Sequence, residues 1–181
     1  MREVSAEAVP TLAWIGLGAN LGDRGQALAQ AVQAMARLPH TKVHAVSSLY
    51  SSAPVDATGP DYLNAVACLQ TTLSPFELLK QLQSIELAAG RERPYRNAPR
   101  TLDLDILLFG DWTSNDPVLT VPHPRLFERA FALLPLAELA PDKVSKVALQ
   151  KTADQQIEKI ADASQWCPRL GEHEDGRFRA L

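Results

Sequence analysis

The sequence of 181 residues lacks the features of an exported or membrane-spanning protein. Its two cysteines, Cys68 and Cys167, lie far apart and belong to no CxxC pair, so we expect buried thiols in a reducing, cytoplasmic setting. No stretch approaches ~18 consecutive apolar residues. The N-terminus has no basic region followed by an apolar run. The sequence therefore predicts neither a membrane span nor a signal peptide.

The sequence also has no strong excess of positive or negative side chains. The formal net charge is -3, which leaves no basic footprint for non-specific nucleic-acid binding. A hydrophobic content of 46% is ordinary for a globular protein, and the length fits one domain with or without an extension. We expect a cytoplasmic monomer that binds small molecules and neither nucleic acid nor membrane.

The hydrophobic pattern between residues 12 and 109 predicts the order strand, helix, strand, strand, helix, strand. Residues 12–17, residues 43–50, part of residues 62–73 and the stretch around residues 102–109 have strand character. Asp23 starts the first helix, which runs to about Leu38, and Ser74, with Glu77 three residues later, caps the second. The predicted fold class is α+β, a ferredoxin-like β-α-β-β-α-β sandwich in which helices pack on an antiparallel sheet.

The last predicted strand carries the clearest chemical pattern. Read with period two, one face is apolar: Leu102, Leu104, Ile106 and Leu108. The opposite face holds Asp103 and Asp105 and then Leu107 and Phe109, so we expect a central strand rather than an edge strand. Two carboxylates at i and i+2 repel unless a cation joins them, and Mg²⁺ shared with phosphates suits such ligands. Guanidinium groups that could bind phosphate precede them: Arg91, Arg93, Arg96 and Arg100.

Two other segments have the composition of binding loops. A glycine-rich turn is expected at residues 18–22, directly after the first strand. Counted from Gly16, its glycine spacing differs from the dinucleotide fingerprint, and it lacks the ending of a Walker A loop. Such a turn allows a neighbouring group to approach the backbone closely. The loop at 51–61 contains Pro54, Gly59 and Pro60 and is too long for a tight hairpin.

Together these motifs resemble the 6-hydroxymethyl-7,8-dihydropterin pyrophosphokinases of the folate pathway. The resemblance rests on four motifs: Arg96-x-Ala98-Pro99-Arg100-x-x-Asp103-Leu104-Asp105, Gly16-x-Gly18-Ala19-Asn20-Leu21-Gly22, Tyr62-Leu63-Asn64, and Val121-Pro122-His123-Pro124-Arg125 with Arg129-x-Phe131. It spans roughly residues 12–141, which we expect to form the pyrophosphokinase domain. Residues 1–11 would be a lead, and 142–181 an extension of unknown role with weak helical pattern at 143–163.

The resemblance implies a reaction and a set of site residues. The pterin hydroxyl would attack the β-phosphorus of ATP, the co-substrate, giving AMP and the pterin pyrophosphate. Asp103 and Asp105 would hold two Mg²⁺ ions, and either could take the hydroxyl proton. The implied catalytic residues are Arg100, Asp103, Asp105 and Arg129. The implied ATP-binding residues are Gln83, Glu86, Arg91, Arg93, Ile106, Thr120 and His123. The implied pterin-binding residues are Asn20, Ser52, Ala53, Pro54, Val55, Tyr62, Asn64 and Phe131.

Two alternative functions stay open at this point. A non-catalytic ferredoxin-like module that binds a nucleotide or RNA would need exposed aromatic residues on the sheet and a basic surface. An ATP-dependent enzyme acting on another alcohol would differ only around Asn64 and Phe131. The acidic balance and the paired aspartates weigh against the binding module.

Overall fold

The computed structural model describes residues 8–54, 59–90 and 102–168. A six-stranded antiparallel sheet lies at its centre, in the order β5-β1-β4-β3-β8, with β2 also paired to β4. Its strands are β1 (Thr11–Ala19), β2 (Thr41–Val46), β3 (Leu49–Ser52), β4 (Tyr62–Thr71), β5 (Asp103–Phe109) and β8 (Ile157–Ala161). A separate small hairpin joins β6 (Ser114–Asn115) to β7 (Thr120–Val121).

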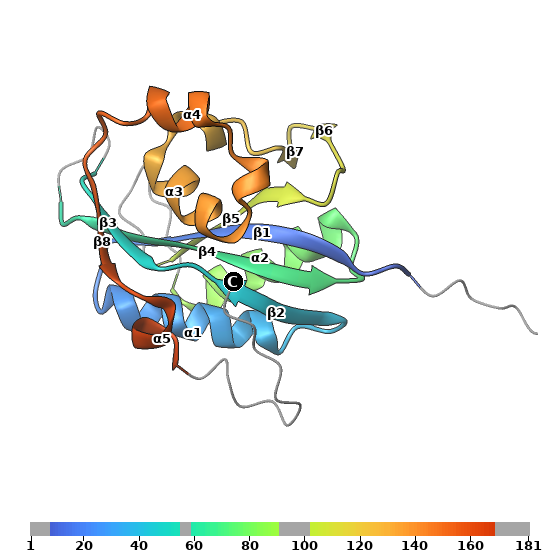
Figure 1. Ribbon diagram of the computed structural model, residues 1–181. Coiled ribbons are helices and arrows are strands. Elements are labelled where there is room, and N and C mark those ends of the chain that lie inside the picture. The colour runs from blue at the N-terminus through green and yellow to red at the C-terminus, as the bar shows by residue number, and fades with distance from the viewer. Residues whose placement is uncertain (1–7, 55–58, 91–101, 169–181) are drawn as a thin grey trace, which may run out of the picture.

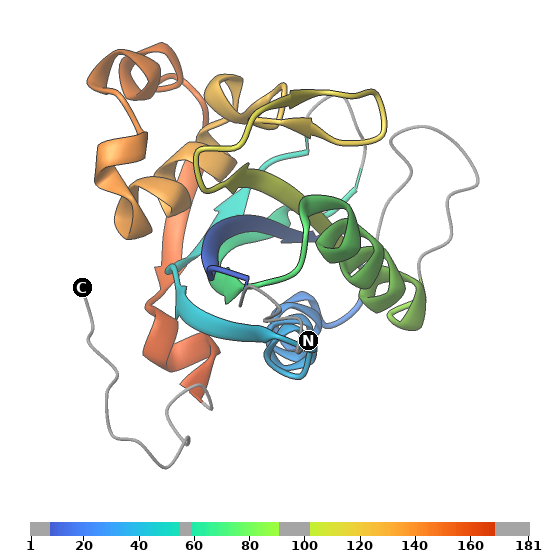
Figure 2. The same cartoon turned by 90° about the vertical axis from the view of Figure 1, so that its right-hand side faces the viewer.

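Helices lie on both faces of this sheet, as Figures 1 and 2 show. The helices α1 (Arg24–Ala36), α2 (Pro75–Ala88) and α5 (Ala163–Trp166) lie on one side, here called the α1/α2 face. The helices α3 (Ala130–Leu139) and α4 (Lys146–Lys151) lie on the other, here called the α3 face. Two short 3-10 helices, η1 (Leu126–Glu128) and η2 (Pro141–Lys143), flank α3. The predicted ferredoxin-like class is confirmed. In the described part of the chain, no helix has both the length and the apolarity to cross a membrane.

Local sequence signals explain where α1 and α2 begin. The Asp23 side chain accepts a hydrogen bond from the Gln26 N–H at 3.0 Å and so caps α1. At α2, the Ser74 hydroxyl accepts from the Glu77 N–H while the Glu77 carboxylate accepts from the Ser74 N–H, a complete capping box. The buried apolar residues recur at helical spacing, with Leu28, Val32 and Met35 in α1 and Leu78 and Leu82 in α2.

The segment predicted as one strand at 43–50 is instead two strands. The ladder breaks at Ser47 and Ser48, and β2 and β3 pair with successive parts of β4. Ser47 fills the break, since its N–H donates to the Val66 carbonyl at 2.8 Å and its hydroxyl accepts from the Val66 N–H at 2.9 Å. The Trp166 indole donates to the Ser47 carbonyl at 3.0 Å, so the break leaves these backbone groups paired.

The prediction that Asp103–Phe109 forms a central strand was wrong. In the described sheet β5 lies at one end and pairs with β1. Its apolar run reflects burial of both faces by helices rather than pairing along both edges. Leu104 and Ile106 belong to the core under α1 and α2, whereas Leu107 and Leu108 belong to the core under α3.

A β-bulge in β5 also corrects the predicted faces. Opposite β1, Ile15 pairs with Ile106 and Trp14 with Leu108, so Leu107 is an extra residue. One extra residue reverses the alternation beyond it. Leu108 therefore packs on the α3 face, and Phe109 belongs to the core of the α1/α2 face. Asp103, Asp105 and Leu107 keep the common face that period two predicts.

The C-terminal segment adds a strand where a weak helical pattern was predicted. After the short helix α4, β8 pairs with β3, with Ile157 opposite Ser52. Ile157 and Ile160 are therefore strand residues, and the helical interpretation of this part was wrong. Beyond β8, Trp166 and Cys167 reach the core of the α1/α2 face.

Candidate active site

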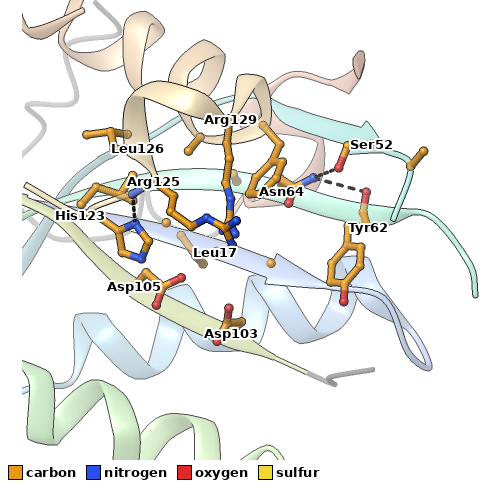
Figure 3. A pocket seen from close by; sticks show the side chains of 17 residues that line it. Leu17, Ser52, Tyr62, Asn64, Asp103, Asp105, His123, Arg125, Leu126 and Arg129 are labelled. Carbon is orange, nitrogen blue, oxygen red and sulfur yellow. Dashed lines mark hydrogen bonds between the residues drawn. The ribbon is translucent and has the colours of Figure 1, made fainter. Parts of the chain in front are cut away.

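A cleft of about 170 Å³ opens on the α3 face of the sheet. Its floor is formed by β1 and β4, and its walls come from β5, from the segment leading into α3, and from the end of β3 (Figure 3). Gly16 and Gly18 of β1 lie on this floor. A Cβ atom on Gly16 would lie 3.3 Å from Cδ2 of Leu107, the bulged residue of β5. A side chain at position 16 would therefore press on the adjoining wall.

One wall of the cleft is acidic. Asp103 and Asp105 line it together because residues i and i+2 of a strand point to the same side (Figure 3). Between them, the Leu104 N–H donates to the Glu86 carboxylate at 2.9 Å. Glu86 is 2% exposed on α2, so it anchors the beginning of β5 from the opposite face of the sheet. The strand that carries the two aspartates is thus fixed by a hydrogen bond from the α1/α2 face.

The facing wall is basic and comes from the segment between β7 and α3. His123, Arg125 and Arg129 all line the cleft (Figure 3). The His123 N–H donates to the Leu107 carbonyl at 2.9 Å, which ties this segment to β5. The Arg125 N–H donates to Nδ1 of His123 at 3.2 Å, so Nδ1 is unprotonated and the neutral ring carries its proton on Nε2.

Burial and the neighbouring charges shift the pKa values of two basic groups in the cleft. Burial, and then the neighbouring Arg129 charge, lower the pKa of His123, against a smaller opposite effect of Asp103. Burial and Arg125 likewise lower the pKa of Arg129, while Asp105 and Asp103 oppose that shift. His123 is therefore a neutral donor near pH 7, beside the guanidinium groups of Arg125 and Arg129. An acidic wall that faces guanidinium groups suits a polyphosphate bound together with a cation.

The far end of the cleft combines an amide with an aromatic ring. Asn64 of β4 is 4% exposed, and its Nδ2 donates to the Ser52 hydroxyl at 2.7 Å. Phe131, at the start of α3, also lines the cleft, and the Arg129 guanidinium carbon lies 5.3 Å from its ring centroid. A buried amide beside an aromatic face can recognise a flat heterocycle by its polar edge and by stacking.

The structure brings together most of the predicted site residues that it describes. Those that line the cleft are Ser52, Ala53, Tyr62, Asn64, Asp103, Asp105, His123, Arg129 and Phe131. Pro54 lines a second hollow that adjoins the cleft. Predicted residues that lie outside the described part of the chain are Val55, Arg91, Arg93 and Arg100.

Five predicted residues lie away from the cleft lining. Asn20 is 1% exposed, directly after the last residue of β1. Gln83 is exposed on α2, and Ile106 belongs to the core of the α1/α2 face. Thr120 of β7 donates through its hydroxyl to the Asp116 carbonyl at 3.0 Å. Together with the buried Glu86, these residues keep their substrate-binding roles only as predictions.

Some lining residues were missing from the predicted set. Arg125 belongs to the Val-Pro-His-Pro-Arg motif, so its charge next to His123 was the signal that could have found it. Leu107 lies on the same face of β5 as Asp103 and Asp105, so period two was the signal that could have found it. Leu126 and Ala132 are apolar residues that nothing in the sequence distinguishes from other core residues.

A profile of the family described as 7,8-dihydro-6-hydroxymethylpterin-pyrophosphokinase (HPPK) matches residues 14–141. Over 130 residues the chain is 50% identical to a 2-amino-4-hydroxy-6-hydroxymethyldihydropteridine pyrophosphokinase of Pseudomonas aeruginosa, which covers 71% of this chain and 80% of the relative. Over 146 residues it is 44% identical to the Bacillus subtilis protein of the same name, which covers 80% and 87%.

Similar folds occur among solved structures. A crystal structure of Plasmodium falciparum HPPK-DHPS with pteroate aligns with a TM-score of 0.57 and 15% identity. The alignment covers 75% of this chain and 41% of the Plasmodium chain, so this chain spans about two fifths of that protein. At this identity the likeness concerns the fold alone.

Proposed function

The chain belongs to the 7,8-dihydro-6-hydroxymethylpterin-pyrophosphokinase family, and we propose that the cleft between β5 and α3 is where its reaction takes place. The protein transfers pyrophosphate from ATP to the hydroxymethyl group of 6-hydroxymethyl-7,8-dihydropterin in folate biosynthesis. One observation carries the assignment of the site. The cleft joins a polar, aromatic end around Asn64 to a region where paired aspartates face arginines.

At the polar end, the pterin ring would stack on Phe131 and meet the amide of Asn64. Ser52 accepts from Nδ2 of Asn64 and so orients the amide, which supports Oδ1 as the acceptor for a ring N–H. Tyr62 and Ala53 lie at the same end. This arrangement would hold the hydroxymethyl group toward the aspartates, in keeping with the need to align two substrates.

At the charged end, the basic wall would bind the polyphosphate. The hydroxyl oxygen forms a bond to the β-phosphorus, and the bond from that phosphorus to the oxygen of the α-phosphate breaks, releasing AMP. Arg129 would offset charge on the transferred group, and Nε2 of His123 would donate to a phosphate oxygen. Arg125 would add a second guanidinium. Asp103 and Asp105 both line the cleft, so each is a candidate acceptor for the hydroxyl proton.

The donor set of the acidic wall fits Mg²⁺. Asp103 and Asp105 offer carboxylate oxygens, the hard ligands that Mg²⁺ prefers. In the ranges that the structure describes, no group of three or more His, Cys, Asp or Glu side chains gathers for a metal. Mg²⁺ at this wall would complete its shell with water and substrate phosphates, as is usual for this ion. We propose two ions there, which would neutralise charge on the phosphates.

Cytoplasmic location and a monomeric state remain predictions. Both described cysteines, Cys68 and Cys167, are buried free thiols, which supports a reducing compartment. Burial raises the pKa of each thiol to about 11, so both are protonated at neutral pH.

Release of AMP from Mg·ATP, with and without 6-hydroxymethyl-7,8-dihydropterin, tests the function. We expect AMP that depends on the pterin, without ADP. Formation of ADP alone would keep the phosphate chemistry and overturn pyrophosphate as the transferred group. AMP released with another alcohol and not with the pterin would favour the alternative enzyme. Failure of the protein to bind ATP would contradict the assignment of the cleft as the active site.

A further inference from the structure

Helix α3 begins at a cleft residue that cannot cap it. Arg129 occupies the N-cap position with extended backbone angles (φ -124°, ψ 112°) and makes no side-chain cap bond. A guanidinium has donors only, so it cannot accept from the free N–H groups of a first helical turn. The next residue, Ala130, is 2% exposed, and burying its N–H without a partner would be costly.

Gln155 supplies the missing acceptor from a distant part of the chain. Its Oε1 accepts from the Ala130 N–H at 2.8 Å, and its Nε2 donates to the Glu128 carbonyl at 2.7 Å. These two residues flank Arg129 on either side. A single amide therefore ties down the peptide groups before and after the arginine, which fixes the direction in which its side chain leaves the backbone.

The segment that carries Gln155 is itself anchored at both ends. The Gln155 N–H donates to the carbonyl of Thr152, which is 3% exposed at the end of α4. Two residues after Gln155, Ile157 pairs with Ser52 on the opposite side of the site. The hollow that adjoins the cleft is bordered by Ser52, Arg129 and Gln155 together. Residues 152–157 thus join the basic wall at Arg129 to the end of β3 at Ser52, although they lie beyond residues 14–141 of the family match.

We propose that Gln155 is a positioning residue. It holds the Arg129 guanidinium where it can contact the transferred pyrophosphoryl group. The proposal rests on the role assigned to Arg129 under the proposed function. It gives the C-terminal extension a part in the reaction through the backbone of Arg129, without contact between Gln155 and the substrates.

The first test compares Gln155→Met, which keeps an unbranched side chain and removes both bonds, with Gln156→Met as the matched control. Gln155→Met is expected to lower kcat roughly ten-fold, since small displacements of a catalytic group cost one to two powers of ten. The KM values for ATP and pterin are expected to change less than about two-fold, because Arg129 acts on charge that develops in the transition state. The control is expected to keep the parent kcat. An unchanged kcat in Gln155→Met would overturn the proposal.

A double-mutant cycle separates positioning from a general loss of structure. If Gln155 acts through Arg129, adding Gln155→Met to Arg129→Ala is expected to change kcat by less than about two-fold. An equal ten-fold loss in both backgrounds would mean that Gln155 acts elsewhere, and would overturn the proposal. If Arg129→Ala alone kept the parent kcat, the catalytic role proposed for Arg129 would be contradicted. This result distinguishes an error in the proposed function from an error in the role of Gln155.

A second variant keeps the test meaningful if Gln155→Met does not fold. Gln155→Glu retains an acceptor for the Ala130 N–H and loses the donor to the Glu128 carbonyl. It is expected to fold, with a loss of kcat smaller than that of Gln155→Met and again absent in the Arg129→Ala background. Parent kcat in a folded Gln155→Glu, with an unfolded Gln155→Met, would assign Gln155 to stability alone and overturn the proposal.

Discussion

The two faces of the sheet are covered in different ways. On the α1/α2 face, a continuous apolar core joins β1, β4 and β5 to α1 and α2. On the α3 face, an apolar core occupies one part, around Leu133 and Leu136, while another part opens into the cleft. Strand β5 belongs to both faces, with Leu104 and Ile106 on one and Asp103 and Asp105 on the other.

This difference separates stability from chemistry within single strands. Because side chains alternate, a strand can be anchored by burial on one face while it presents charged groups on the other. Glu86 adds to this separation, since its carboxylate accepts from Leu104 N–H, between the two aspartates. We therefore expect substitutions of residues that line the cleft to change activity, and substitutions on the α1/α2 face to change stability.

The largest expected effect tests the cleft side of the comparison. Asp103→Asn and Asp105→Asn keep the size of the side chain and remove its charge. Each is expected to lose several kcal/mol of transition-state stabilisation, on the order of 10³-fold in kcat, because the carboxylates would hold the cation at the phosphates. The free energy of unfolding is expected to change by less than about 1 kcal/mol. Steady-state kinetics and urea unfolding on the same preparations measure both quantities.

Asp111→Asn is the matched control for this pair. Asp111 lies just beyond β5, its side chain is fully exposed, and it forms a surface ion pair with Lys143 at 3.4 Å. The control is expected to keep the parent kcat, since exposed pairs contribute little. Near-parent kcat in either Asp103→Asn or Asp105→Asn would contradict the proposed metal ligands.

The next effect tests the α1/α2 face. Leu82 of α2 is 0% exposed, so Leu82→Ala removes buried methyl groups and leaves a cavity. The free energy of unfolding is expected to fall by about 3 kcal/mol, with kcat per folded molecule unchanged. Leu87→Ala on the same helix, where Leu87 is 67% exposed, provides the control and is expected to change stability by less than about 0.5 kcal/mol. A loss of kcat in folded Leu82→Ala that matched the aspartate variants would break the separation of the two faces.

Sequence signals predicted the α1/α2 face better than the cleft because they are local there. The cap at Asp23, the capping box at Ser74 and the buried stripes all depend on residues within one or two turns. The edge position of β5 and its bulge at Leu107 depend on the pairing with β1, which no local pattern encodes. Period two was right for Asp103 and Asp105 because they precede the bulge, and wrong for Leu108 and Phe109 because they follow it.

The same distinction applies to the site. The aspartate pair could be predicted because both members lie on one strand. His123 and Arg129 were found through resemblance, since their meeting with β5 depends on contacts such as that of the His123 N–H with the Leu107 carbonyl. Gln155 could not be found, because its bonds to Glu128 and Ala130 span 27 and 25 residues and follow no spacing rule.

The smallest expected effect concerns the pH dependence of stability on the cleft side. Burial and the charge of Arg129 lower the pKa of His123 below its usual value of 6.5. Below about pH 6.5 the unfolded chain therefore binds more protons at this residue than the folded chain does. The contribution of His123 to the free energy of unfolding is complete above that pH, and it declines as the pH falls toward the lower folded pKa. His123→Gln is expected to lose stability less steeply between pH 7.5 and pH 5.

Urea unfolding of the parent and His123→Gln at several pH values in this window measures the difference in slope. His44, exposed on β2, provides a matched histidine substitution, His44→Gln. We expect the larger change of slope at His123, because its ring lies among the charges of the cleft and His44 faces solvent. Parallel curves for the parent and His123→Gln would contradict the lowered pKa. They would also remove the reason for treating His123 as a neutral donor, because a ring that charges as easily as a free histidine would present a cation to the phosphates.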